Sequence, residues 1–179
     1  MSEDDIICVS SSGNWSKGWP AGLEILIRKD RILGRKKVKY SYFTAFNGKN
    51  PPLPADSLMK MYEIAGEVEK KRDFEILKEE ISSIIIKEPG LWGGGKITIK
   101  SSRGDIEIKT TPKGNCMKEL LILVRALVVF APDKTYLETK TGSQLIISLP
   151  KSVLPERTPE SFFKTCVNCG KQIPVASEM

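Results

Sequence analysis

The chain has 179 residues, of which 40% are hydrophobic, and it carries a net charge of +6 without a single histidine. This length and apolar content exclude wholesale disorder and suit one packed domain with a small appendage, and without histidine the usual general base near neutral pH is missing. No apolar run is long enough to span a membrane, and the acidic start is unlike a secretory signal peptide, so we expect a cytoplasmic protein that is not an enzyme.

The first third of the chain predicts β-structure, because apolar and polar residues alternate there with a period of two. The expected strands cover residues 6–9, 23–27, 31–33 and 37–42. Residues 10–18 contain serines and glycines and are expected to form a loop.

The positive charge is concentrated in residues 28–39, which hold seven basic residues and one acid and thus account for the whole net charge. The basic residues are Arg28, Lys29, Arg31, Arg35, Lys36, Lys37 and Lys39. Such a patch suits nucleic acid, an anionic membrane face or an acidic protein. A solvated edge hairpin whose lysines block aggregation has the same pattern, and charge alone leaves both interpretations open.

A break at residues 47–54 precedes a predicted surface helix over 55–72, whose apolar residues recur three and four positions apart. Strands are predicted over 74–77 and 81–87, the second rich in β-branched isoleucine. A loop with Trp92 follows, and we take this tryptophan as a candidate interaction residue.

Residues 96–100 and 105–109 form the clearest predicted hairpin, since both alternate strictly around a Ser-Ser-Arg-Gly turn. A helix over 117–130 is apolar on most sides, so we expect it to lie across the sheet with both Leu121 and Leu127 buried. A second hairpin is predicted over 134–149, followed by a proline-rich linker at 150–161.

Three segments together resemble prokaryotic pleckstrin-homology-like domains. They are Glu80–Lys87, the stretch G-G-G-K-I-T-I at Gly93–Ile99, and the leucine-rich helix from Met117. The earlier segment 23–34 is similar to the strand and basic turn that open those domains. The resemblance implies an α+β fold, a bent antiparallel sheet or partly open β-barrel capped by a C-terminal helix. The domain would cover residues 1–149, with its core at 20–131, a helical insertion at 48–73 and an extra hairpin at 134–149.

That resemblance also implies a non-catalytic binding or adaptor module, which recognises a protein or an anionic membrane partner near its first strands. The protein would then be cytoplasmic, with the option of peripheral membrane attachment. The alternative is a nucleic-acid-binding protein that uses the basic residues 28–39, with nearby aromatic side chains stacking on bases.

Residues 162–179 contain Cys166 and Cys169, whose C-x-x-C-G spacing resembles the first arm of a zinc ribbon. A structural zinc ion needs four ligands, and no second pair follows. We therefore expect zinc only if another chain or a longer natural C-terminus supplies two more ligands, and no cofactor otherwise. Two free cysteines on a frayed tail are the alternative.

Overall fold

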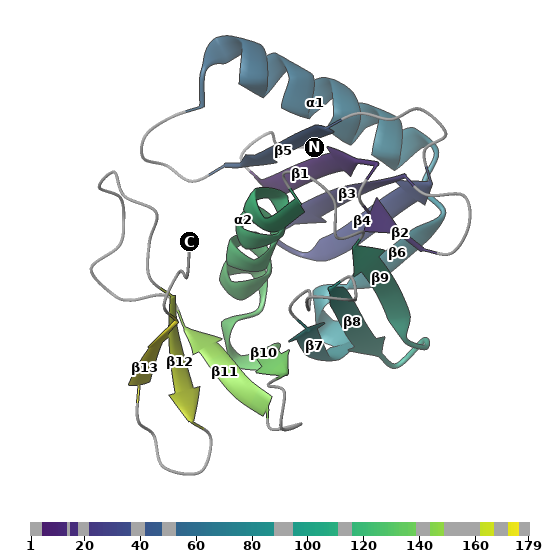
Figure 1. The fold of residues 1–179 in the computed structure, drawn as a ribbon. Coiled ribbons are helices and arrows are strands. Elements are labelled where there is room, and N and C mark those ends of the chain that lie inside the picture. The colour runs from purple at the N-terminus through teal and green to yellow at the C-terminus, as the bar shows by residue number, and fades with distance from the viewer. Residues whose placement is uncertain are drawn as a thin grey trace.

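The described residues form two β-sheets and two long helices, an α+β architecture (Figure 1). The structure is a computed structural model that describes residues 5–13, 15–17, 22–36, 42–47, 53–87, 95–110, 116–138, 144–148, 162–166 and 172–175. The α+β class is as predicted. In the described residues the strands divide between two sheets instead of one bent sheet, and neither sheet closes into a barrel, so the pleckstrin-homology-like arrangement stays a prediction.

The first sheet, which we call sheet A, is antiparallel throughout and has the strand order β5-β1-β3-β4-β6. Its strands are β1 (Ile6–Ser12), β3 (Leu23–Arg28), β4 (Arg31–Lys36), β5 (Tyr42–Phe46) and β6 (Phe74–Leu77). The neighbouring strands β1 and β3 are buried along their whole length, because both faces of the sheet are covered.

The second sheet, sheet B, has the order β13-β12-β11-β10-β7-β8-β9-β2. Its strands are β2 (Trp15–Ser16), β7 (Ile81–Lys87), β8 (Lys96–Ser101), β9 (Ile106–Thr110), β10 (Thr135–Glu138), β11 (Gln144–Ser148), β12 (Phe162–Cys166) and β13 (Gln172–Val175). A short 3-10 turn, Lys78–Glu80, leads the chain from β6 of sheet A into β7 of sheet B.

Both predicted hairpins are present in sheet B. In the β8–β9 pair Ile97 lies opposite Ile108 and Ile99 opposite Ile106, as the alternation indicated. The β10–β11 pair is antiparallel too, but β10 also pairs with β7 in parallel, which corrects the expectation of an antiparallel layer. Parallel strands need a long crossover connection, and the helix between β9 and β10 is part of it.

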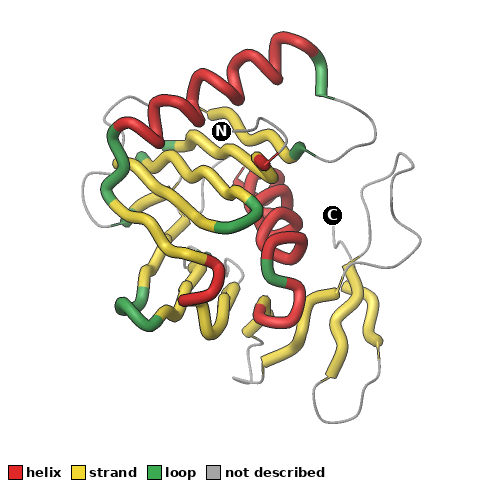
Figure 2. Tube along the Cα trace, turned by 180° about the vertical axis from the view of Figure 1, so that it is seen from behind, coloured by secondary structure: helices red, strands yellow, loops and turns green. Residues whose placement is uncertain are grey.

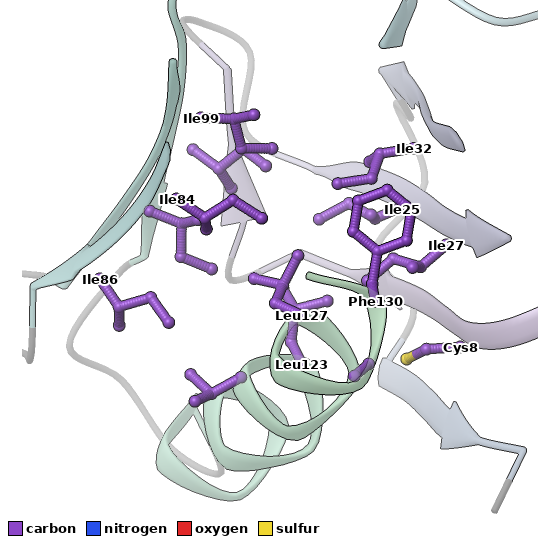
Figure 3. Close-up of a cluster of buried hydrophobic side chains, with 14 of the residues drawn as sticks. Cys8, Ile25, Ile27, Ile32, Ile84, Ile86, Ile99, Leu123, Leu127 and Phe130 are labelled. Carbon is purple, nitrogen blue, oxygen red and sulfur yellow. The ribbon is translucent and has the colours of Figure 1, made fainter. Parts of the chain in front are cut away.

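The main hydrophobic core lies where helix α2 (Cys116–Phe130) packs against both sheets. Figure 3 shows Leu123, Leu127 and Phe130 of α2 between isoleucines of sheet A and isoleucines of sheet B. Leu127 is 2% exposed, as predicted, but the prediction for Leu121 is wrong, because 44% of it is exposed. Leu121 and the exposed Val129 are eight residues apart and share the helix side that faces neither sheet.

The second helix, α1 (Ala55–Lys70), covers the opposite face of sheet A and confirms the predicted surface helix (Figures 1 and 2). Its buried residues are Met61, Ile64, Ala65 and Val68. They pack on Val9, Leu26 and Leu33 of the sheet in a core of their own. Sheet A therefore separates two apolar layers, one beneath each helix.

Gly34 of β4 provides a test of this packing. A Cβ atom at Gly34 would overlap the ring carbons Cε1 and Cζ of Phe74, on the paired strand β6. We expect Gly34→Ala to lower the free energy of unfolding by about 1–3 kcal/mol, measured by urea denaturation. Adding Phe74→Leu should recover part of the loss, and an unchanged stability in the single variant would contradict the packing.

Candidate functional site

A groove of about 720 Å³ lies between the C-terminal half of α1 and the turn that joins β3 to β4. The turn contributes Arg28–Arg31, and α1 contributes Gly66, Glu69 and Lys70. Leu33 of β4 and Glu75 of β6 also line the groove, together with Asp5 and Arg72. Three segments that are distant in the sequence, around Asp5, residues 28–33 and residues 66–75, therefore meet at one site.

The strand register explains the floor of this groove. Leu33 lies directly opposite Glu75 on the neighbouring strand, so both side chains are on the α1 face of sheet A. Helix α1 packs mainly on β1, β3 and β4. The side of the helix that faces β6 is left as one wall of a groove, with the β3–β4 turn at its end.

Gly66 keeps that wall open. A Cβ built at Gly66 meets no other atom within 4 Å, so the packing of the described chain does not require a glycine there. Glycine inside a helix is less stable than alanine by roughly 0.5–1 kcal/mol. The groove thus contains a stretch of exposed helix backbone, and the glycine that exposes it lowers the stability of the fold.

The charges of the groove are largely paired with one another. Its lining holds five basic residues and four acidic ones. Arg28 Nε donates to Glu69 Oε1 at 2.6 Å, and Lys29 Nζ lies 3.3 Å from Asp5 Oδ1. Each of these contacts joins the β3–β4 turn to another segment, so the charges hold the groove together.

Arg31 is at the centre of the remaining pairs. Its guanidinium contacts Asp30 at 2.7 Å and Glu75 at 2.5 Å, and Glu75 also accepts from Arg72 at 2.9 Å. The contact with Arg31 lowers the pKa of the Asp30 carboxyl, and the two acids raise the pKa of Arg31. Lys70 is left as the lining cation without a salt bridge to any described residue.

Two other residues of the basic segment lie outside this groove. Arg35 contacts the buried carboxylate of Glu24 and extends to Glu67 on α1, where the distance is 2.8 Å. The hydrogen bond from Arg35 lowers the pKa of Glu67. The main-chain amide of Lys36 donates to Asp73. Arg35 thus connects sheet A to α1 from within the fold.

Low pH should weaken these ion pairs. The pKa values of Asp30 and Glu67 lie below their ordinary values of 3.8 and 4.5, so their contribution to stability is present above those values. It is lost as the pH falls through the lowered pKa of each group in the folded state. We expect the free energy of unfolding to fall below about pH 4, and to fall less steeply in Asp30→Asn, in urea titrations at several pH values. Equal steepness would contradict the assignment.

The structure leaves several predicted site residues untested. Lys37, Lys39 and Trp92 lie outside the described residues, as does Cys169. Cys166 is the last residue of β12, whose backbone pairs with β11 and β13. Within the part of the chain that is described, no group of three or more potential metal ligands comes together, so zinc stays a prediction.

Sequence reasoning missed a polar cluster at the end of β1, where it predicted a loop. Ser11 Oγ donates to Glu24 at 3.0 Å, Ser12 Oγ donates to Glu119 of α2 at 2.6 Å, and both serines are buried. Trp15 Nε1 donates to Ser10 Oγ at 3.1 Å. These bonds attach β1 to its neighbours, and the signal for them was the run of three serines directly after an apolar strand.

The groove residues on α1 were missed as well, although their spacing was visible. Gly66, Glu69 and Lys70 are three and four positions apart and therefore share one helix face. None of the helices in the described ranges is long and apolar enough to cross a membrane. No protein-family model, curated protein or solved structure was found to match the chain.

Proposed function

We propose that the chain is a non-catalytic binding module, and that a segment of a protein partner lies in the groove beside α1. The observation that carries the proposal is a groove whose walls bear both signs of charge, with Gly66 leaving helix backbone open to a ligand. Polypeptides present mixed charge and main-chain groups, which such walls can match.

The ion pairs favour a protein over a polyanion. A phosphate-rich partner would have to draw Arg28 and Arg31 away from Glu69, Asp30 and Glu75, which already neutralise them. The lining carries five positive and four negative charges, a net +1. Counterion release on nucleic acid requires many uncompensated cations, and so does attraction to an anionic membrane surface.

A non-catalytic role has support of its own. Burial raises the pKa of the Cys8 thiol, so this cysteine stays protonated and is a poor nucleophile. The serines at the end of β1 face carboxylates with no histidine to activate them, since the chain has none. A pleckstrin-homology-like scaffold is part of this proposal, and its support is the sequence resemblance. The tail would bind zinc only if another chain or a longer natural C-terminus supplies two more ligands.

A phage-displayed peptide library tests the function. Peptides selected on the immobilised protein should bind wild type and lose at least about tenfold in affinity for Gly66→Leu, which fills the groove without changing its charge. Met59→Leu, on the exposed side of the same helix, is the matched control and should bind normally.

Parallel assays use phosphatidylserine vesicles and a single-stranded RNA oligonucleotide. The proposal expects neither to bind at moderate salt concentration. If no selected peptide depends on Gly66, or if vesicles or RNA bind and Gly66→Leu has no effect on them, the groove is not the binding site.

A further inference from the structure

The open backbone at Gly66 limits what can occupy the groove. Any other residue at this position would place a Cβ atom in the space beside the helix, and no other part of the described chain fills that space. A ligand can therefore approach the helix backbone more closely here than at a residue that carries a side chain. A close approach of this kind suits the main chain of a polypeptide in an extended conformation.

Lys70 adds a chemical preference beside that opening. It lies one helical turn after Gly66 on the same helix face, about 6 Å further along the axis. All four lining acids are engaged with other basic residues, so the ammonium group of Lys70 accounts for the net positive charge of the groove. A single lysine suits a single carboxylate, whereas the arginines that would hold a phosphate in a bidentate way are already paired.

We infer that the occupant is an extended acidic peptide segment, whose main chain crosses α1 at Gly66 and whose Asp or Glu side chain pairs with Lys70. This inference rests on the proposed function and specifies its ligand. Glu69 is held by Arg28 on the same wall, so it leaves Lys70 available. The segment therefore needs one well-placed carboxylate and not a long acidic tract.

Two peptide sublibraries separate this inference from the proposed function. One fixes an Asp or Glu at its central position, and the other excludes both residues throughout. We expect groove-dependent binders from the first and none of comparable affinity from the second. If acid-free peptides bind equally well and depend on Gly66, the function stands and the acidic ligand is wrong. If neither sublibrary yields a groove-dependent binder, both are wrong.

Variants of the protein then locate the contacts, with a fluorescein-labelled peptide from the acidic sublibrary as the probe in anisotropy titrations. Gly66→Ala should unfold at a higher urea concentration than wild type and still bind the probe about tenfold more weakly. A gain in stability joined to a loss of binding excludes misfolding as the cause. Unchanged binding in Gly66→Ala would overturn the close approach.

The charge contact has its own variants. Lys70→Glu should lower the affinity for the probe by about tenfold or more, and Lys70→Arg should keep most of that affinity. Lys71→Glu, a neighbouring exposed lysine that does not line the groove, is the matched control. A probe whose acidic residue is replaced by lysine should bind Lys70→Glu better than wild type. Equal losses in Lys70→Glu and Lys71→Glu would overturn the pairing.

Discussion

Replacing Arg35 by alanine is expected to destabilise the protein by about 3–5 kcal/mol, because Glu24 would lose the guanidinium that neutralises its buried charge. The Glu24 side chain is 1% exposed, and Arg35 donates to its Oε2 atom from Nε at 2.8 Å and from Nη2 at 2.5 Å. Glu24 also accepts a hydrogen bond from Ser11, so the loss would reach into β1. Urea denaturation followed by circular dichroism measures the effect.

A double-mutant cycle isolates this ion pair. Glu24→Gln should destabilise the protein by itself, but Arg35→Ala should cost much less in the Glu24→Gln background than in wild type. If Arg35→Ala costs under about 1 kcal/mol in both backgrounds, the pair is not buried as described. Charge-reversal variants that probe ligand binding should avoid Arg35, because its loss destabilises the fold and would mask an effect on the ligand. Lys29, whose side chain is 63% exposed, is a better position for a charge-reversal variant.

Leu127→Ala is expected to cost about 2–5 kcal/mol, since this side chain lies between the two sheets and leaves a cavity when it is truncated. Leu121→Ala is the matched control, because it makes the same chemical change on the exposed side of the same helix. The control should shift the free energy of unfolding by less than about 1 kcal/mol.

The comparison between these two variants tests the position of α2. A large loss at Leu127 and a small one at Leu121 supports a helix packed against both sheets along one side. Similar losses at both positions would mean that α2 is covered all round. The measurement is urea denaturation of both variants at the same protein concentration.

The elements with strict periodicity were predictable from the sequence. In the β8–β9 hairpin apolar and polar residues alternate, and in helix α1 apolar residues recur every three or four positions, so the local pattern alone predicted both elements. The end of β1 was not predictable in this way. Its serines lack an apolar pattern, and their place in a strand depends on buried partners such as Glu119, which is 107 residues away from Ser12.

The division of the strands between two sheets could not be predicted from the local sequence pattern either. The 3-10 turn between β6 and β7 directs adjacent strands into different sheets, and the parallel contact of β10 with β7 depends on the path of α2. The exposure of Leu121 has the same origin, because a mostly apolar helix does not reveal which side its neighbours leave uncovered.

The candidate site was predictable in its charge and not in its pairing. The basic residues of the β3–β4 turn are evident in the sequence, but apart from Asp30 their acidic partners come from distant segments. Arg28 is 41 residues from Glu69, and Arg31 is 44 residues from Glu75. Only the fold brings these partners together, and it turns an expected basic patch into a nearly neutral groove.

Chemical-shift mapping tests the central claim most directly. The amide signals of the ¹⁵N-labelled protein are followed while the peptide from the acidic sublibrary is added. We predict that the largest shifts fall on Gly66, Lys70 and the β3–β4 turn around Asp30, with little change in β8 and β9. Shifts concentrated in sheet B, with Gly66 and Lys70 unaffected, would contradict a binding site beside α1.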